Sequence, residues 1–398
     1  MRRLAALAAV GLLLAAVPAC TAAAEPEITV LASWTGEEEA AFMKVVKGFT
    51  DTTGLRVRYR GTRALGQVLA AEVKTGRPPD IAVLPGLGDL MPYVRDGKAR
   101  QLGADVDESQ RQDARSQWPQ LQRGGRNQLY AIQVKADPKG LVWFNPRRGT
   151  PPDTAEGLLA GGGWCLGLGS AATSGWPGTD WIETLLLQRY GPELYQRWVA
   201  GGLPWTDDRV RQAWLDYGRV VPATVPATLL TDFADAGAPM FDPRPGCSRE
   251  HQGGFIALAY RGREYERDYD FRPFPPFPGA PQASLVSADL AALFTDNGHA
   301  RALLRHLAAN PVPQPGTEAL ATRLTGRANS EQPMCFDASD LMPVELRTVF
   351  YRAVLEFTAN QAGLPELLAR LENVRLDLVQ PSADQTQWVT VSCGKGRA

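Results

Sequence analysis

The sequence predicts an α/β protein with a parallel sheet, and three observations support this prediction. Between residues 27 and 84, short apolar strands alternate with amphipathic helices, the usual pattern of parallel sheets. A second succession of strand, loop and helix is read between Trp164 and Gly191. The length of 398 residues, 44% of them hydrophobic, is enough for one large or two medium domains with separate cores.

The overall charge gives no sign of a polyanionic partner. The formal net charge is −1, so nothing points to nucleic acid or to an anionic membrane surface. No internal repeat occurs at solenoid spacing.

The N-terminus has the features of a secretion signal. Arg2 and Arg3 form a basic region, and the apolar run 4–17 is too short to span a bilayer comfortably. The run ends in Val-Pro-Ala-Cys, which resembles the lipobox of bacterial lipoproteins. We therefore expect a signal peptide at 1–19, a lipidated Cys20 and a flexible tether over 20–27. The alternative is an ordinary secretion signal with a cysteine there by chance.

The remaining cysteines agree with export. Without Cys20 there are four, an even number that suggests two disulfides in an oxidising compartment, with three possible pairings. We favour Cys165–Cys247 and Cys335–Cys393, and four buried free thiols are the alternative. No cysteine or histidine spacing indicates a metal site.

The ligand side of the first unit follows from its strand order. Strands are predicted at 28–31, 55–59 and 81–84, and ligands bind outside the carboxyl ends of parallel strands. Trp34, Arg63 and Gly86 directly follow these ends, one in each case. The alternative for Trp34 is a core residue, and for Arg63 a solvated charge.

The middle of the chain leads to a second lobe. Two strand-like pieces, 129–134 and 141–144, flank a segment with Lys135 and Lys139, and a Pro-rich break follows at 146–152. A second Pro-rich passage, 271–281, would suit a stiff connection back to the first lobe.

The stretch after Trp164 is predicted to hold a ligand. A loop of small residues, 174–178, carries Trp176, which no amphipathic face includes. Thr179 or Asp180 is the expected helix N-cap, with Glu183 completing a capping box. The alternative is that Trp176 packs on the hinge side and never touches ligand.

Catalytic motifs are absent. There is no G-x-S-x-G elbow, H-E-x-x-H pair or P-loop, and the three histidines have no evident catalytic partner. Pairs of carboxylates occur, so a secreted glycosidase stays an alternative.

These residues resemble a known family. Residues 28–102 resemble the extracellular solute-binding proteins of carbohydrate ABC transporters, through Trp34, the Thr-Gly pair at 53–54, the segment 76–81 and the Asp-Gly turn at 96–97. Segments 139–145, 175–183 and 336–343 resemble the alpha-glucoside-binding subgroup.

The resemblance implies a two-lobed periplasmic-binding-protein-like fold of type II, with ligand between hinged lobes. The expected lobes are 28–134 with 283–330 and 135–282 with 331–393, and the chain is expected to cross near 131–137, 274–282 and 325–333.

The resemblance also implies a function. The chain would be a monomeric lipoprotein on the outer face of the cell membrane that binds a sugar and delivers it to ABC permease subunits. It implies no catalysis, cofactor or metal. A further alternative is a protein that binds another solute, such as a peptide or polyamine. A polyamine is the less suitable of these, because the predicted site contains cations rather than clustered carboxylates. The expected ligand-binding residues are Trp34, Arg63, Gly86, Lys135, Lys139, Trp176, Asp180 and Asp340.

Overall fold

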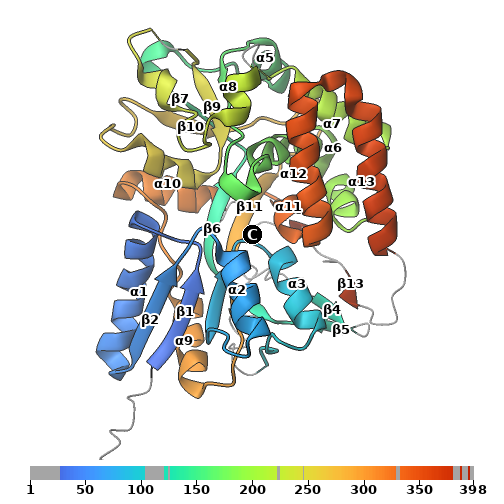
Figure 1. Ribbon diagram of the computed structural model, residues 1–398. Helices are drawn as coiled ribbons and strands as arrows, with labels where there is room; N and C mark the ends of the chain where they lie inside the picture. The colour runs from blue at the N-terminus through green and yellow to red at the C-terminus, as the bar shows by residue number, and fades with distance from the viewer. Residues whose placement is uncertain are drawn as a thin grey trace, which may run out of the picture.

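The computed structural model has two lobes, each built around its own sheet, with one pair of strands running between them (Figure 1). It describes residues 27–103, 121–123, 126–221, 225–244, 246–328, 332–379, 386–387 and 393–394. The expected signal peptide, the lipidated Cys20 and nearly all of the tether lie outside the described residues.

The first lobe surrounds a seven-stranded sheet. Its strands are β1 (Glu27–Ala32), β2 (Arg56–Gly61), β3 (Ile81–Leu84), β6 (Ala131–Lys139), β11 (Ser284–Leu293), β12 (Met334–Phe336) and β14 (Cys393–Gly394). The order is β14-β12-β11-β3-β1-β2, with β6 also pairing β11. Because β1 pairs with both β2 and β3 in parallel, the predicted parallel unit is confirmed.

Helices cover both faces of this sheet. They are α1 (Glu37–Thr53), α2 (Leu65–Lys74), α3 (Leu87–Arg95) and α9 (Gly298–Ala309). Apolar residues of α1 and α9, such as Phe42 and Leu303, pack with Ile28 of β1 on one face. On the other face, Leu69 of α2 and Leu90 of α3 belong to a second core. Burial of these amphipathic stripes explains why the periodicity was readable in sequence.

The link between the lobes is a long antiparallel ladder. β6 pairs with β11 over residues 131–139 and 285–292, with an irregularity at Asp289. The predicted strand 141–144 is confirmed as β7, whereas the strand predicted to end at residue 134 continues through Pro138 to Lys139. Among the described strands, β11 is the one that pairs with β6, and a strand without a second partner strand tolerates the missing N–H of proline.

The second lobe surrounds a four-stranded sheet. Its strands are β7 (Leu141–Phe144), β8 (Trp164–Cys165), β9 (Arg249–Gln252) and β10 (Asp270–Pro273), in the order β10-β7-β9-β8. Its helices are α5 (Ala155–Ala160), α6 (Trp176–Val199), α7 (Asp208–Gly218) and α8 (Val225–Leu230), with the 3-10 helix η4 (Gly254–Tyr260). Val142 and Trp164 face α6, whereas Leu141 and Trp143 face η4 and α10 (Glu318–Ala328).

Helix α6 begins earlier than predicted. Its N-cap is Gly175, with φ 106°, and Trp176 and Pro177 form its first turn. A side chain at Gly175 would meet the backbone oxygen of Tyr351, so only glycine fits this start. The predicted capping box at Asp180 and Glu183 is therefore wrong. Gly191 does interrupt the helix, with φ 79°.

The C-terminal part joins both lobes. Helices α11 (Ala338–Leu341), α12 (Val344–Ala359) and α13 (Leu364–Val379) pack beside α6 and α7, as Figure 1 shows. β12 and β14, however, extend the seven-stranded sheet. A small third sheet contains β4 (Leu121–Arg123), β5 (Arg126–Gln128) and β13 (Thr386–Gln387). The exact lobe boundaries stay a prediction.

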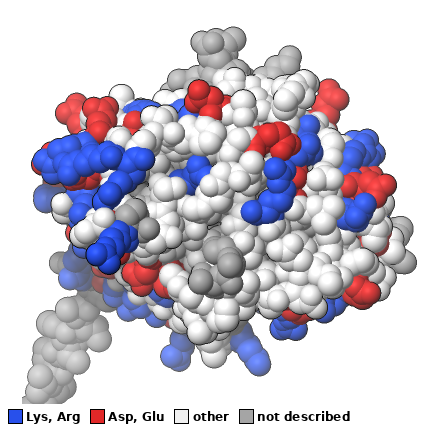
Figure 2. All heavy atoms as spheres, turned by 90° about the horizontal axis from the view of Figure 1, so that it is seen from above, with Lys and Arg blue, Asp and Glu red and all other residues white. Residues whose placement is uncertain are grey.

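The surface in Figure 2 carries both signs of charge. Lys and Arg alternate with Asp and Glu around its rim, and uncharged residues fill most of the middle. Neither sign forms a continuous field on this face. Within the described residues, no helix has the length and apolar character needed to cross a membrane.

Candidate functional site

The site is organised along β6, the strand that leaves the first lobe for the second. Lys135, Asp137 and Lys139 are buried and alternate along it, so their side chains share one face. A lysine therefore lies near each end of the crossing. Each is held by carboxylates from a different part of the fold.

Lys139 connects β6 to α6 and to the cap of α11. Its Nζ lies 2.7 Å from Oδ2 of Asp180 and 3.0 Å from Oδ2 of Asp337. Burial acts to raise the pKa of Asp337, but Lys139 and a hydrogen bond from Ser339 hold it down at about 2. Burial raises the pKa of Asp180 to about 8, against the attraction of Lys139. Oδ1 of Asp180 is buried and has no hydrogen-bond partner.

Glu183 caps α11 instead of its own helix. Its carboxylate accepts the backbone N–H of Ala338 at 2.7 Å and that of Ser339 at 3.2 Å. Tyr195 donates to Glu183 at 3.4 Å and to the carbonyl of Phe336 at 3.0 Å. This acid thus positions α11, and with it Asp337 beside Lys139.

Three partly exposed aromatic rings form a cluster, and two of them lie next to Lys139. Trp176 contacts Phe233 and Phe255, with ring centroids 4.9 and 5.7 Å apart, and the two phenylalanines are 6.3 Å apart. Nζ of Lys139 lies 5.1 Å from the ring of Trp176 and 5.7 Å from that of Phe255. We call Trp176, Phe233 and Phe255 the aromatic platform. The position of Lys139 above two of the rings is a cation–π arrangement.

Sequence analysis missed two members of this platform. Phe255 lies in η4, which packs against β6 through Gly254 and Pro138. Phe233 follows α8 in a short turn. The pair Gly253-Gly254 before Phe255 was the available signal, because adjacent glycines often mark a close backbone approach.

The first-lobe side is held by Glu38. Nζ of Lys135 lies 2.9 Å from Asp137 and 3.4 Å from Glu38, and Glu38 also lies 3.5 Å from Arg63. The side chain of Arg63 is 66% exposed, so this contact is loose. Burial raises the pKa of Asp289 to about 7, while Lys135 acts to lower it.

Trp34 and Gly86 serve packing in this structure. The ring of Trp34 is 2% exposed and lies 5.3 Å from that of Phe42, and its carbonyl accepts a hydrogen bond from Tyr59. Gly86 is the N-cap of α3, and a Cβ there would lie 2.3 Å from the carbonyl oxygen of Asp340. Gly86 thus permits close contact between α3 and α11.

The expected residues therefore form two groups. Asp180 and Trp176 both lie beside Lys139. Asp340 is close to them, because burial, Asp337 and Asp180 together raise the pKa of Asp340. Lys135 and Arg63 meet at Glu38, and Lys135 and Trp34 both act to lower the pKa of Asp289.

Both disulfides form in the expected pairing. Cys165–Cys247 joins β8 to the segment before β9, with Cα atoms 5.2 Å apart. Cys335–Cys393 joins opposite residues of β12 and β14, with Cα atoms 4.0 Å apart.

Two curated relatives match most of this chain. The osmoprotective compounds-binding protein of Synechocystis is 29% identical over 380 residues, which are 85% of this chain and 90% of the relative. The alpha-glucosides-binding periplasmic protein of Rhizobium meliloti is 31% identical over 310 residues, which are 70% of this chain and 68% of the relative. The chain belongs to the solute-binding proteins of carbohydrate ABC transporters. No protein-family model matches.

Solved structures agree with the fold. A structure from a study of xylan utilisation by Caldanaerobius polysaccharolyticus has TM-score 0.70 and 14% identity, over 87% of this chain and 99% of the other. A chitin oligosaccharide binding protein has TM-score 0.66 and 16% identity, over 88% and 98%. RafE with raffinose has TM-score 0.60 and 12% identity, over 88% and 99%. The two-lobed α/β fold is thereby confirmed, and the named relatives are binding proteins, not enzymes.

Proposed function

We propose that this protein captures an alpha-glucoside or another oligosaccharide between its lobes and delivers it to an ABC permease. The aromatic platform beside Lys139 and Asp180 is the observation that carries the proposal. Aromatic faces stack on the apolar faces of pyranose rings, and buried charged groups hydrogen-bond their hydroxyls. The names of the two relatives support a glucoside-like ligand.

The charges favour a neutral ligand. Lys135, Lys139 and Arg63 each lie within 3.5 Å of a carboxylate. The cations of this region are thus already paired, so an anionic solute would have to displace a carboxylate. A neutral solute rich in hydroxyl groups needs no such exchange.

A thermal-shift screen across solute classes tests the proposal. Maltose, trehalose and longer glucosides should raise the melting temperature in a saturable manner, because a ligand that binds only the folded state stabilises it. Peptides, polyamines and anionic sugars should not. Stabilisation by one of those classes alone would replace the sugar proposal with another solute.

An assay of the products separates binding from hydrolysis. The same glucosides, incubated with the protein and recovered, should be unchanged. Turnover that survives repurification would favour the alternative, a secreted glycosidase lipoprotein.

The extracytoplasmic location is proposed together with a lipid anchor at Cys20. Cys20→Ala should move the protein from the membrane fraction to the soluble one, and mass spectrometry of the mature parent should show a modified Cys20. An unmodified N-terminus would indicate an ordinary secretion signal. Size-exclusion chromatography should give the mass of a monomer.

A further inference from the structure

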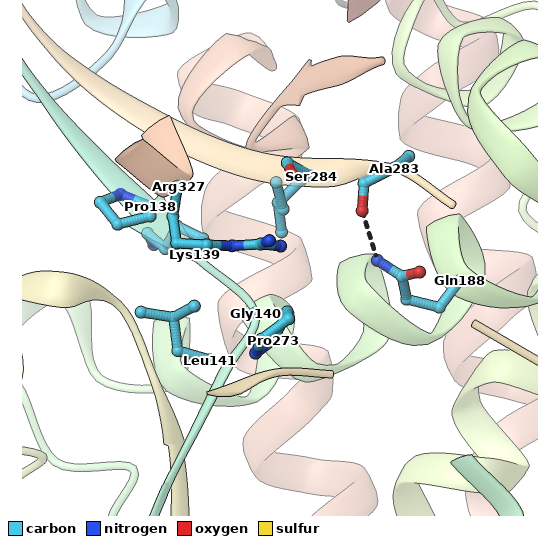
Figure 3. Close-up of a pocket in the computed structure, with 10 residues that line it drawn as sticks. Pro138, Lys139, Gly140, Leu141, Gln188, Pro273, Ala283, Ser284 and Arg327 are labelled. Carbon is cyan, nitrogen blue, oxygen red and sulfur yellow. Dashed lines mark hydrogen bonds between the residues drawn. The ribbon is translucent and has the colours of Figure 1, made fainter. Parts of the chain in front are cut away.

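A small cavity lies where the connections between the lobes converge (Figure 3). Its volume is about 10 Å³. The first connection contributes the segment 138–141, the second contributes Pro273 and the segment 283–285, and Arg327 comes from the end of α10, just before the third. Gln188 of α6 completes the lining. A group bound here would touch the first two connections and the helix that precedes the third.

The lining is positively charged. Arg327 extends across the cavity toward Gln188, as Figure 3 shows. Among the described residues, no carboxylate lines the cavity. Lys139 also lines the cavity, but its Nζ is 2.7 Å from Asp180 and 3.0 Å from Asp337. Of the described lining residues, Arg327 is thus the one whose charge has no carboxylate beside it.

The surroundings of Arg327 do not balance it. Arg323, one turn earlier on α10, is itself held by Asp270 and by the carbonyl of Phe271. Burial and the charge of Arg323 lower the pKa of Arg327. Within the described residues, Arg327 has no ion pair, whereas Arg347 and Arg375 each hold a carboxylate. The buried Arg249 has no ion pair either, but its Nη2 donates to the carbonyl of Gly162.

Gln188 leaves one acceptor in the cavity region. Its Nε2 donates to the carbonyl of Ala283 at 2.9 Å, which fixes the orientation of the amide. Its Oε1 is buried and has no partner. A guanidinium has five N–H donors, so Arg327 has donors to offer a ligand in this cavity.

We propose that this cavity, which we call the hinge cavity, binds a small inorganic anion such as a halide, held by Arg327. The space suits one monatomic ion or one water molecule, and the unbalanced guanidinium favours the ion. Because two connections and the end of α10 border the cavity, the bound anion stabilises one arrangement of the lobes. Its occupancy is thereby coupled to lobe closure.

Chloride titration of the ligand-free protein is the first test. Chloride replaces gluconate at constant ionic strength, so that general screening of charges stays fixed. The melting temperature should rise saturably by about 1–3 °C. This measurement needs no sugar, so its outcome is independent of the proposed function.

Two variants make the test specific. Arg327→Gln should abolish the response to chloride, and Arg352→Gln, on the exposed surface of α12, should keep it. A parent without a saturable response, or an equal response in Arg327→Gln, would overturn the proposal.

Crystals of the parent grown with bromide provide a test that needs no variant. An anomalous peak beside Arg327 is expected. A water molecule there, without anomalous signal, would show that the hinge cavity holds solvent only.

The coupling to closure, which rests on the proposed function, predicts that sugar affinity changes with chloride in the parent and not in Arg327→Gln. If the anomalous peak is clear but the affinity for sugar does not change with chloride, the anion site exists and the proposed coupling to lobe closure is wrong.

Discussion

At the scale of single residues, Trp176 is the strongest candidate for ligand contact. Its indole is partly exposed, and it is held in place by Phe233, Phe255 and Lys139. A ring held in advance loses less freedom when the ligand binds. The ring thus presents a face whose position does not depend on the ligand.

Trp176→Ala should weaken sugar binding strongly. One stacked ring covers about 100 Å² of apolar surface, or roughly 2 kcal/mol, which is about 30-fold in affinity. Calorimetry should show this loss, and Trp176→Phe should keep part of the affinity because a ring remains. An alanine variant that binds as tightly as the parent would show that Trp176 only packs against its neighbours.

Glu250 gives a prediction about pH. It is buried on β9, and its Oε2 accepts a hydrogen bond from Tyr260 at 2.7 Å, while Oε1 has no partner. Burial raises its pKa to about 8, against the hydrogen bond from Tyr260. The folded protein therefore binds more protons than the unfolded chain between the ordinary carboxyl pKa and about 8. Stability that this group supplies at low pH is lost as pH rises through that range, by up to about 1.4 kcal/mol per pH unit.

Glu250→Gln removes this titration. Urea unfolding between about pH 5 and pH 8 should show the variant gaining stability relative to the parent as pH rises. The exposed Glu193→Gln should run parallel to the parent. Parallel curves for Glu250→Gln as well would mean that Glu250 is ionised in the folded protein throughout.

At the scale of elements, strands and helices with a regular pattern of apolar residues could be predicted from the sequence, whereas their exact starts and ends could not. The strands and helices between residues 27 and 95 follow from alternation, helical spacing and terminal glycines. The path of β6 through Pro138 could not be read, because a proline is allowed there only by the absence of a strand on one side. The start of α6 at Trp176 could not be predicted either, because it depends on the close contact of Gly175 with the backbone of α12. Such facts depend on tertiary neighbours.

The disulfide Cys165–Cys247 gives a prediction at this scale. It closes a segment of 82 residues that includes the start of α6. Replacing both cysteines by serine should lower the free energy of unfolding by about 4–5 kcal/mol, because the unfolded chain regains freedom. The pair Cys335 and Cys393, with 58 residues between them, should cost about the same in this account. Non-reducing peptide mapping that joins Cys165 to another cysteine would contradict the assignment.

At the scale of the whole molecule, the site depends on how two lobes approach each other. Residues of the aromatic platform come from α6, from η4 and from the turn after α8, all in the second lobe, whereas Glu38 and Arg63 belong to the first. Sequence analysis identified Lys139, Asp180 and Trp176 but not Phe233 and Phe255, because only the packing of η4 over β6 brings Phe255 to Trp176. Under the proposed function, lobe closure brings these two groups to the same ligand.

One ion pair spans the two lobes at the surface. Arg261, which follows η4, lies 3.4 Å from Glu37 at the start of α1, and the two side chains are 66% and 60% exposed. An exposed pair of this kind contributes little to folding, but it exists only when the lobes are together. Its removal should therefore change ligand affinity more than stability.

A charge exchange tests this contact. Arg261→Glu and Glu37→Arg should each weaken sugar binding by roughly 1.5- to 5-fold, mainly through faster dissociation of the ligand. The double variant should recover most of the affinity, since the pair is restored with its charges exchanged. Exchange of Lys47 and Asp51, an exposed pair within α1 alone, should leave affinity unchanged. If the double variant binds no better than the two single variants, Arg261 and Glu37 do not meet in the ligand-bound state, and closure brings other parts of the lobes together.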